Sequence, residues 1–143
     1  WKSAWSVCQK LIERTGYRLR KQQLESSTIE LHVKCLCNYS YHRSINVVSF
    51  SNSTNFSRYI KKLWEEINTN YTPLKIAVRL SNLSNNIAKQ YNLFKTNNKP
   101  ILAYKAIDKI NDKFGSFTVK PASMLIAKNA APNRIAFGKP ILE

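Results

Sequence analysis

The stretch TIELHVKCLC, residues 28–37, alternates apolar and polar side chains with a period of two. One face of such a segment would hold Ile29, Leu31, Val33, Cys35 and Cys37. The other face would hold Glu30, His32, Lys34 and Leu36. This alternation is typical of a strand that is buried on one side only. The sequence therefore predicts a half-buried strand at the centre of the fold.

The segments that follow predict two more strands. Residues 38–42 should turn the chain, and residues 43–50 should form a second strand antiparallel to the first. Beyond Pro73, a third strand is predicted over residues 74–83. Its apolar face would hold Leu74, Ile76, Val78 and Leu80, and its polar, basic face Lys75, Ala77, Arg79 and Ser81.

Apolar residues spaced three and four apart predict helices before and between these strands. The first helix covers about residues 3–23, with Gly16 as a weak point, and the second covers about residues 55–68, where Ser51 to Thr54 supply capping side chains. The fold class is therefore α+β, with an antiparallel sheet covered on one face by two helices. One more strand before Trp1 would complete a split βαββαβ motif.

The composition divides the chain into three parts. Residues 1–84 form the domain, residues 85–99 form a linker rich in Asn, Lys and Ser, and residues 100–143 form a helical tail. Within the tail we expect a helix over residues 101–113 and a short helical turn over residues 119–127. Because the chain begins at Trp1 inside a helical pattern, we expect it to be a fragment of a longer protein.

The formal charge of +15 is the strongest global property of the sequence. Lys and Arg are spread over the whole chain, which favours a polyanionic partner and binding that weakens steeply with salt. No apolar run is long enough to span a membrane, and no helix has the basic and bulky apolar faces of a membrane-surface helix. We expect a soluble, cytoplasmic protein without a membrane partner.

Catalytic and metal-binding motifs are not evident in the sequence. It contains no Ser-His-Asp arrangement, Walker loop or GxGxxG, so we expect no catalytic residues in this fragment. Cys8, Cys35 and Cys37 with His32 and His42 lack the spacing of a zinc site. Asp108 and Asp112 lie four residues apart, but surface ion pairing with the neighbouring lysines explains them better than a metal pair.

The outward side chains of the three strands are the best candidate for a binding surface. They are cations, hydroxyls and amides, which suit contacts with a phosphate backbone. The candidate residues are His32, Lys34, Arg43, Ser44, Asn46, Lys75, Arg79 and Ser81. The predicted face lacks the paired aromatic residues that stack unpaired bases, so duplex backbone contact is favoured.

Several motifs resemble the C-terminal half of a Y-family translesion DNA polymerase of the bacterial polymerase IV and V type. They are YRLRKQQL at 17–24, STIELHVK at 27–34, HRS at 42–44, PLKIAVRLSNL at 73–83, AIDKINDKFGSFTVKPASML at 106–125 and RIAFGKP at 134–140. They follow the family order over most of the chain. The sequence departs from the family at Ala77, where Gly is usual, and at His32, where Lys is common.

The resemblance implies a little finger domain that lies along primer-template DNA and holds it against a separate catalytic core. The parent would be a DNA polymerase of DNA repair and the SOS response to DNA damage. Its Mg²⁺-binding carboxylates belong to the core, so the fragment would need no cofactor and would not polymerise alone.

The resemblance also gives a function to QYNLF, residues 90–94, within the predicted linker. This peptide resembles the QLxLF motif with which bacterial polymerases bind the sliding clamp, with Gln90 as hydrogen-bonding anchor, Leu93 and Phe94 as apolar plugs and Tyr91 in place of the usual Leu. Packing of Leu93 and Phe94 on the domain itself is the alternative. For the whole chain, the alternative function is a free-standing RNA- or ribosome-binding α+β module.

Overall fold

The structure, a computed structural model, describes residues 1–36, 38–85 and 99–127. Its elements are α1 (Lys2–Lys21), β1 (Leu24–Cys35), β2 (Ser40–Phe50), α2 (Ser53–Glu65), β3 (Pro73–Asn85), α3 (Lys99–Phe114) and the 3₁₀ helix η2 (Ala122–Ala127). This order confirms the predicted α+β class. Each strand is longer at one or both ends than the alternation alone predicted.

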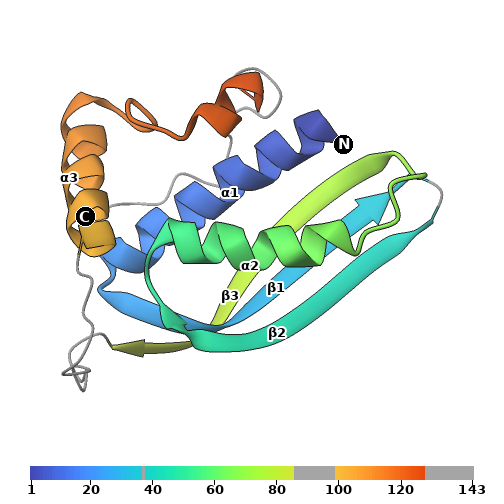
Figure 1. Cartoon of the computed structure of the whole chain (residues 1–143), viewed down its shortest axis with the longest axis horizontal. Helices are drawn as coiled ribbons and strands as arrows, with labels where there is room; N and C mark the ends of the chain where they lie inside the picture. The colour runs from blue at the N-terminus through green and yellow to red at the C-terminus, as the bar shows by residue number, and fades with distance from the viewer. Residues whose placement is uncertain (37, 86–98, 128–143) are drawn as a thin grey trace, which may run out of the picture.

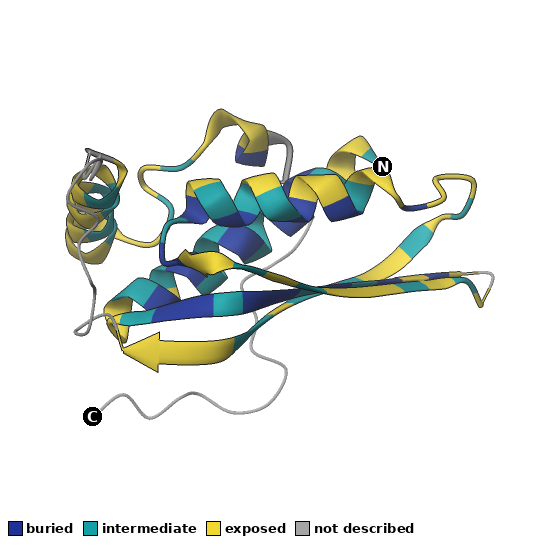
Figure 2. Ribbon diagram, turned by 60° about the horizontal axis from the view of Figure 1, so that its bottom comes forward, coloured by how far each residue is buried: buried dark blue, intermediate teal, exposed yellow. Residues whose placement is uncertain are grey.

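The three strands form one antiparallel sheet in the order β2-β1-β3. The predicted pairing of the first two strands is therefore correct, and β3 pairs along the other edge of β1. Both α1 and α2 lie on the same side of this sheet (Figure 1). In a turned view the sheet lies on one side of both helices, and its edge strands β2 and β3 carry many exposed residues (Figure 2).

The hydrophobic core lies between the sheet and the two helices. Its fully or nearly buried members are Cys8, Ile12, Ile29, Leu31, Val33, Cys35, Phe50, Phe56, Ile60, Leu63 and Ile67. The odd-numbered residues of β1 therefore meet the apolar stripes of both helices, as the two periodicities predicted. Burial raises the pKa of the Cys8 thiol to about 12, which keeps it protonated as a small apolar core residue. Cys37 lies outside the described residues.

Helices α1 and α2 approach each other closely where α2 begins. Asn52 caps α2, because its Oδ1 accepts a hydrogen bond from the backbone N–H of Asn55 at 2.8 Å. A Cβ atom at Gly16 of α1 would lie only 2.5 Å from Oγ of the buried Ser53. Gly16, a weak point by helix propensity, therefore allows the contact between the two helices.

The three tryptophans of the chain gather at the other end of the helix pair. Trp1 lies 5.5 Å from Trp64 between ring centroids, and Trp5 lies 5.2 Å from Trp64. The indole N–H of Trp1 also donates to the backbone carbonyl of Thr69 at 2.7 Å. This tryptophan cluster closes the core between the start of α1 and the end of α2.

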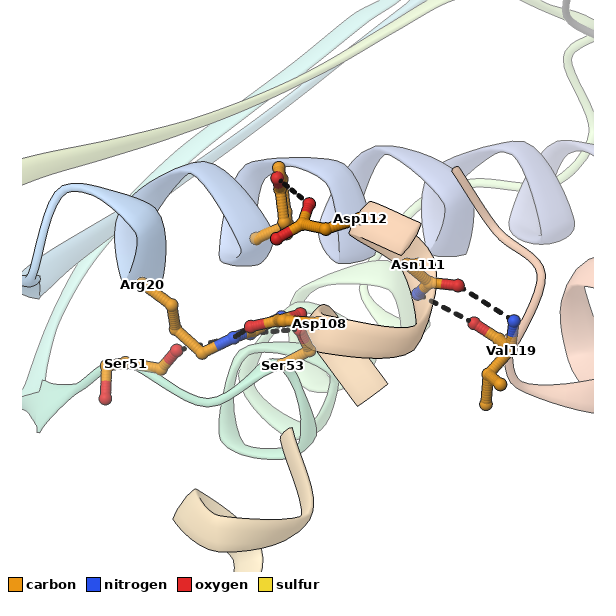
Figure 3. A network of polar contacts seen from close by, with 8 residues as sticks. Arg20, Ser51, Ser53, Asp108, Asn111, Asp112 and Val119 are labelled. Carbon is orange, nitrogen blue, oxygen red and sulfur yellow. Dashed lines mark hydrogen bonds and ion pairs between the residues drawn. The ribbon is translucent and has the colours of Figure 1, made fainter. Parts of the chain in front are cut away.

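Arg20 of α1 joins the tail to the domain (Figure 3). Its guanidinium donates two hydrogen bonds to Asp108 of α3, at 2.6 and 2.8 Å, and a third to Ser53 Oγ at 3.0 Å. The ring of Tyr104 lies 4.6 Å from the guanidinium carbon. One cation therefore holds α3 against the beginning of α2 and the end of α1.

The rest of the tail returns along α1. Tyr17 of α1 donates its hydroxyl proton to Asp112, and the side chain of Asn111 exchanges two hydrogen bonds with the backbone of Val119. The chain then reaches η2, which packs on α1 with Met124 buried. Asp108 and Asp112 thus bind α1, whereas the sequence predicted pairing with lysines of their own helix.

Candidate nucleic-acid interface

The strand register places twelve side chains on the sheet surface opposite the helices, here called the open face. Cross-strand partners share a face, so the even residues of β1 and their partners define it. They are Thr28, Glu30, His32 and Lys34 of β1, Ser40, His42, Ser44 and Asn46 of β2, and Lys75, Ala77, Arg79 and Ser81 of β3. None of these side chains is aromatic except the two imidazoles. Seven of the eight residues predicted from the sequence lie here.

Arg43 is the predicted residue that does not lie on the open face. It pairs with Leu31, whose side chain is buried beneath the helices, and its Nε lies 3.5 Å from a carboxylate oxygen of Glu66 at the end of α2. The prediction grouped it with Ser44, although adjacent residues of a strand point to opposite faces. Arg43 therefore belongs to the helix side of the sheet.

Two lysines face each other across the strands at one end of the open face. Lys34 of β1 and Lys75 of β3 are register partners, and both are exposed. Like charges placed directly opposite each other destabilise a sheet. An anion bound between them would remove that repulsion, so this pair favours a ligand with closely spaced negative charges.

Arg79 extends the positive surface along β3. Its side chain is 75% exposed, and one guanidinium nitrogen lies 3.5 Å from Glu30 Oε2. Because this contact leaves most of the guanidinium in solvent, its remaining donors are available to a ligand. Lys34, Lys75 and Arg79 are the lysine and arginine side chains of the open face.

Glu30 lies directly opposite Arg79, two rows from the lysine pair, and is the main feature of the open face that the predicted site omitted. It accepts a hydrogen bond from Ser81 Oγ at 3.3 Å, and its Oε2 lies 3.8 Å from Nε2 of His42. The sequence had placed Glu30 on the outward side of β1. Its partners on β2 and β3 could be named only from the register.

The two histidines complete the centre of the open face. Nε2 of His32 lies 2.9 Å from Oγ of Ser40, and the His32 and His42 rings meet edge to face with centroids 5.9 Å apart. Glu30, both histidines, Ala77 and Arg79 line a shallow depression of about 380 Å³. His42 was not among the predicted site residues, although it begins the HRS motif; the register makes it the partner of His32.

Other candidate sites fall outside this surface. Among the residues that the structure describes, no three His, Cys, Asp or Glu side chains are arranged to hold a metal ion. In the same part of the chain, no helix is long and apolar enough to cross a membrane. The predicted clamp-binding peptide, residues 90–94, lies outside the described residues.

A comparison with protein families finds a match over the part of the chain that forms the sheet and its first two helices. The model of the impB/mucB/samB family C-terminal domain matches residues 1–93. The chain belongs to this family. It is the C-terminal, little finger region of a Y-family DNA polymerase, as its motifs indicated. A comparison with curated proteins finds no match.

The match covers α1 to β3 and therefore the whole open face of the little finger. It ends before α3, so the docking of the tail on Arg20 is a feature of this chain that the family model does not include.

Proposed function

We propose that this little finger grips the backbone of primer-template duplex with its open face and tethers its polymerase to the sliding clamp through residues 90–94. The lysine pair of β1 and β3 is the observation that carries the first part. Lys34 and Lys75 lie directly opposite each other, and Arg79 follows two rows further along β3. Phosphates of a duplex backbone supply the closely spaced anions that such a surface needs.

The polar character of the open face supports duplex backbone over unpaired bases. Besides the histidines, its uncharged members are four hydroxyls, one amide and Ala77; hydroxyls and amides contact phosphate and sugar. The open face carries no Phe, Tyr or Trp on which bases would stack. The alternative of a free-standing RNA- or ribosome-binding module loses support because the chain belongs to the Y-family polymerases. The nucleotidyl transfer and its Mg²⁺ would belong to the catalytic core of the same polymerase.

Charge reversal tests the assignment of the DNA-binding surface. The double variant Lys75→Glu/Arg79→Glu should weaken duplex binding at moderate salt. The slope of log affinity against log salt concentration should also become shallower by roughly two, because two phosphate contacts are lost. Fluorescence anisotropy of a labelled primer-template duplex measures both quantities.

A matched control separates this surface from the net charge of the chain. Lys61 and Lys62 are exposed on α2, on the far side of the sheet, so Lys61→Glu/Lys62→Glu makes the same charge change elsewhere. The control should lose much less affinity. Equal losses in the two double variants would show that the duplex binds by overall charge and would refute the open face as the interface.

Clamp tethering is tested with the double variant Leu93→Ala/Phe94→Ala. Apolar anchors carry most of the binding energy of short peptides, so the variant should lose clamp binding and keep duplex binding. Surface plasmon resonance with immobilised clamp measures the first, and anisotropy the second. Unchanged clamp binding would assign Leu93 and Phe94 to packing within the chain.

A further inference from the structure

Glu30 is the only acid among the twelve residues of the open face, and it contacts two of the residues that we assign to the duplex backbone. We propose that Glu30 acts as an internal anion that competes with the duplex for Arg79 and Ser81 and so speeds the release of the bound phosphate. The inference rests on the proposed duplex binding and adds to it a residue that limits the strength of the grip.

The position of Glu30 lets it share partners with a bound phosphate. Arg79 lies directly opposite it on β3, with one guanidinium nitrogen 3.5 Å from Oε2. Ser81 Oγ donates a hydrogen bond to Oε1 at 3.3 Å. A phosphate oxygen accepts hydrogen bonds from the same guanidinium and the same hydroxyl. Docking of the duplex therefore breaks these contacts or leaves two anions on one guanidinium, and both arrangements lower the affinity.

The exposure of the two side chains indicates how the exchange takes place. Arg79 is 75% exposed and extends into solvent, where the phosphate arrives, whereas Glu30 is only 21% exposed. The carboxylate thus stays within reach of the guanidinium while the duplex is bound. When the phosphate leaves, Glu30 takes back the donors that it had released. This replacement lowers the cost of breaking the phosphate contact.

The lengths of the Glu30 contacts set the size of the effect. Distances of 3.3 and 3.5 Å are longer than those of strong hydrogen bonds, and an ion pair with one exposed partner is weak. Glu30 should therefore weaken duplex binding without preventing it. We expect its charge to reduce the affinity by about threefold to tenfold.

A limited grip suits a domain of a DNA polymerase. The duplex advances by one base pair for each nucleotide added, so contacts between the little finger and the backbone have to break and form again at that rate. A surface that carried only Lys34, Lys75 and Arg79 would hold the backbone more tightly at each step. Glu30 offsets one of these three cations at the place where the contact breaks.

Glu30→Gln tests this role, because it keeps the size of the side chain and removes its charge. Stopped-flow anisotropy with the whole 143-residue chain and a labelled primer-template duplex measures the association and dissociation rates. The variant should bind about threefold to tenfold more tightly than wild type. Most of the gain should be slower dissociation, because a competitor in direct contact with Arg79 is lost.

Glu66→Gln is the matched control. Glu66 pairs with Arg43 on the helix side of the sheet, so this variant makes the same charge change away from the open face. It should change the affinity by less than about twofold, and mainly through the association rate, because a distant charge acts on the approach of the duplex. Thermal unfolding checks that both variants are folded.

A double-mutant cycle tests whether Glu30 acts through Arg79. In a chain that carries Arg79→Gln, the gain from Glu30→Gln should shrink to about twofold or less, because the shared guanidinium is absent. A gain of the same size in both backgrounds would show that Glu30 repels the duplex only through its charge, and would refute the exchange of partners.

The outcomes separate this inference from the function on which it rests. Unchanged duplex binding in Lys75→Glu/Arg79→Glu would refute the proposed function itself. If that variant loses binding but Glu30→Gln gains no more affinity than Glu66→Gln, the role of Glu30 alone is refuted. Weaker binding in Glu30→Gln would show that Glu30 positions Arg79 for the duplex, and would refute the competition as well.

Discussion

Removing the guanidinium of Arg20 should release the tail from the domain. Arg20→Ala deletes two hydrogen bonds to Asp108, one to Ser53, one to the backbone carbonyl of Ser51 and the contact with the ring of Tyr104. Burial raises the pKa of Glu13, the hydrogen bond with Ser53 and the charge of Arg20 lower it, and Asp108 raises it, so the variant also removes a cation that stabilises the Glu13 carboxylate. The perturbation therefore weakens the tail contact and strains the domain beneath it.

The burial of the pair sets the size of the effect. The side chains of Arg20 and Asp108 are 12% and 17% exposed, so the pair lies much closer to a buried ion pair than to a surface one. Removing one partner of a buried pair costs about 3–5 kcal/mol, and a surface pair contributes about 0–1 kcal/mol. We therefore expect Asp108→Ala to reduce the free energy of tail docking by about 2–3 kcal/mol. Arg20→Ala should also lower the stability of the domain, because the contact with Ser53 is lost.

Hydrogen exchange separates the two effects. In Asp108→Ala, amides of α3 should exchange roughly 30-fold to 150-fold faster, at tenfold for each 1.4 kcal/mol, while those of β1 keep their protection. In Arg20→Ala, protection in β1 should fall as well. Lys109→Ala is the control, because it changes an exposed residue of the same helix. If α3 keeps its full protection in Asp108→Ala, the ion pair does not hold the tail.

Two further substitutions probe the contact between α1 and the start of α2. Gly16→Ala should lower the free energy of unfolding by about 1–2 kcal/mol, because the new Cβ meets Ser53 Oγ, although Ala has the better helix propensity. Urea denaturation measures this loss. The loss caused by Gly16→Ala should be smaller in a chain that already carries Ser53→Ala. Burial raises the pKa of Glu13 above its usual range, so the stability linked to its proton is present at low pH and is lost as pH rises through the folded pKa. Glu13→Gln should therefore stabilise the chain at pH 7, with the gain disappearing below about pH 4 in pH-dependent denaturation. A gain that persists at low pH would contradict this explanation.

Alternation and helical periodicity were sufficient to predict the layers of the domain. The period of two in β1 placed Glu30, His32 and Lys34 on the open side, and the register confirmed that placement. The error at Arg43 arose because it was grouped with its neighbour Ser44. The same alternation places two adjacent strand residues on opposite faces of the sheet. The start of β1 at Leu24 was missed because Glu and Ser have low strand propensity, yet β3 pairs with this segment.

The docking of the tail could not be predicted from local patterns. Arg20 and Asp108 are separated by 88 residues, and no periodicity links a cation on one helix to a carboxylate on another. The spacing of Asp108 and Asp112 favoured pairing within α3 instead. The contacts at the centre of the open face could not be predicted either. The contacts of Glu30 with His42, Arg79 and Ser81 depend on strand register and not on spacing along the sequence.

The position of the tryptophan cluster allows unfolding and ligand binding to be followed by two separate fluorescence signals. All intrinsic indole emission comes from Trp1, Trp5 and Trp64, which lie on the helix side of the sheet, whereas the open face carries no indole or phenol. Excitation at the red edge of tryptophan absorption should therefore report unfolding of the helix layer and stay nearly silent when a ligand occupies the strands. A dye on the duplex would report occupancy, so stability and binding can be recorded in the same cuvette.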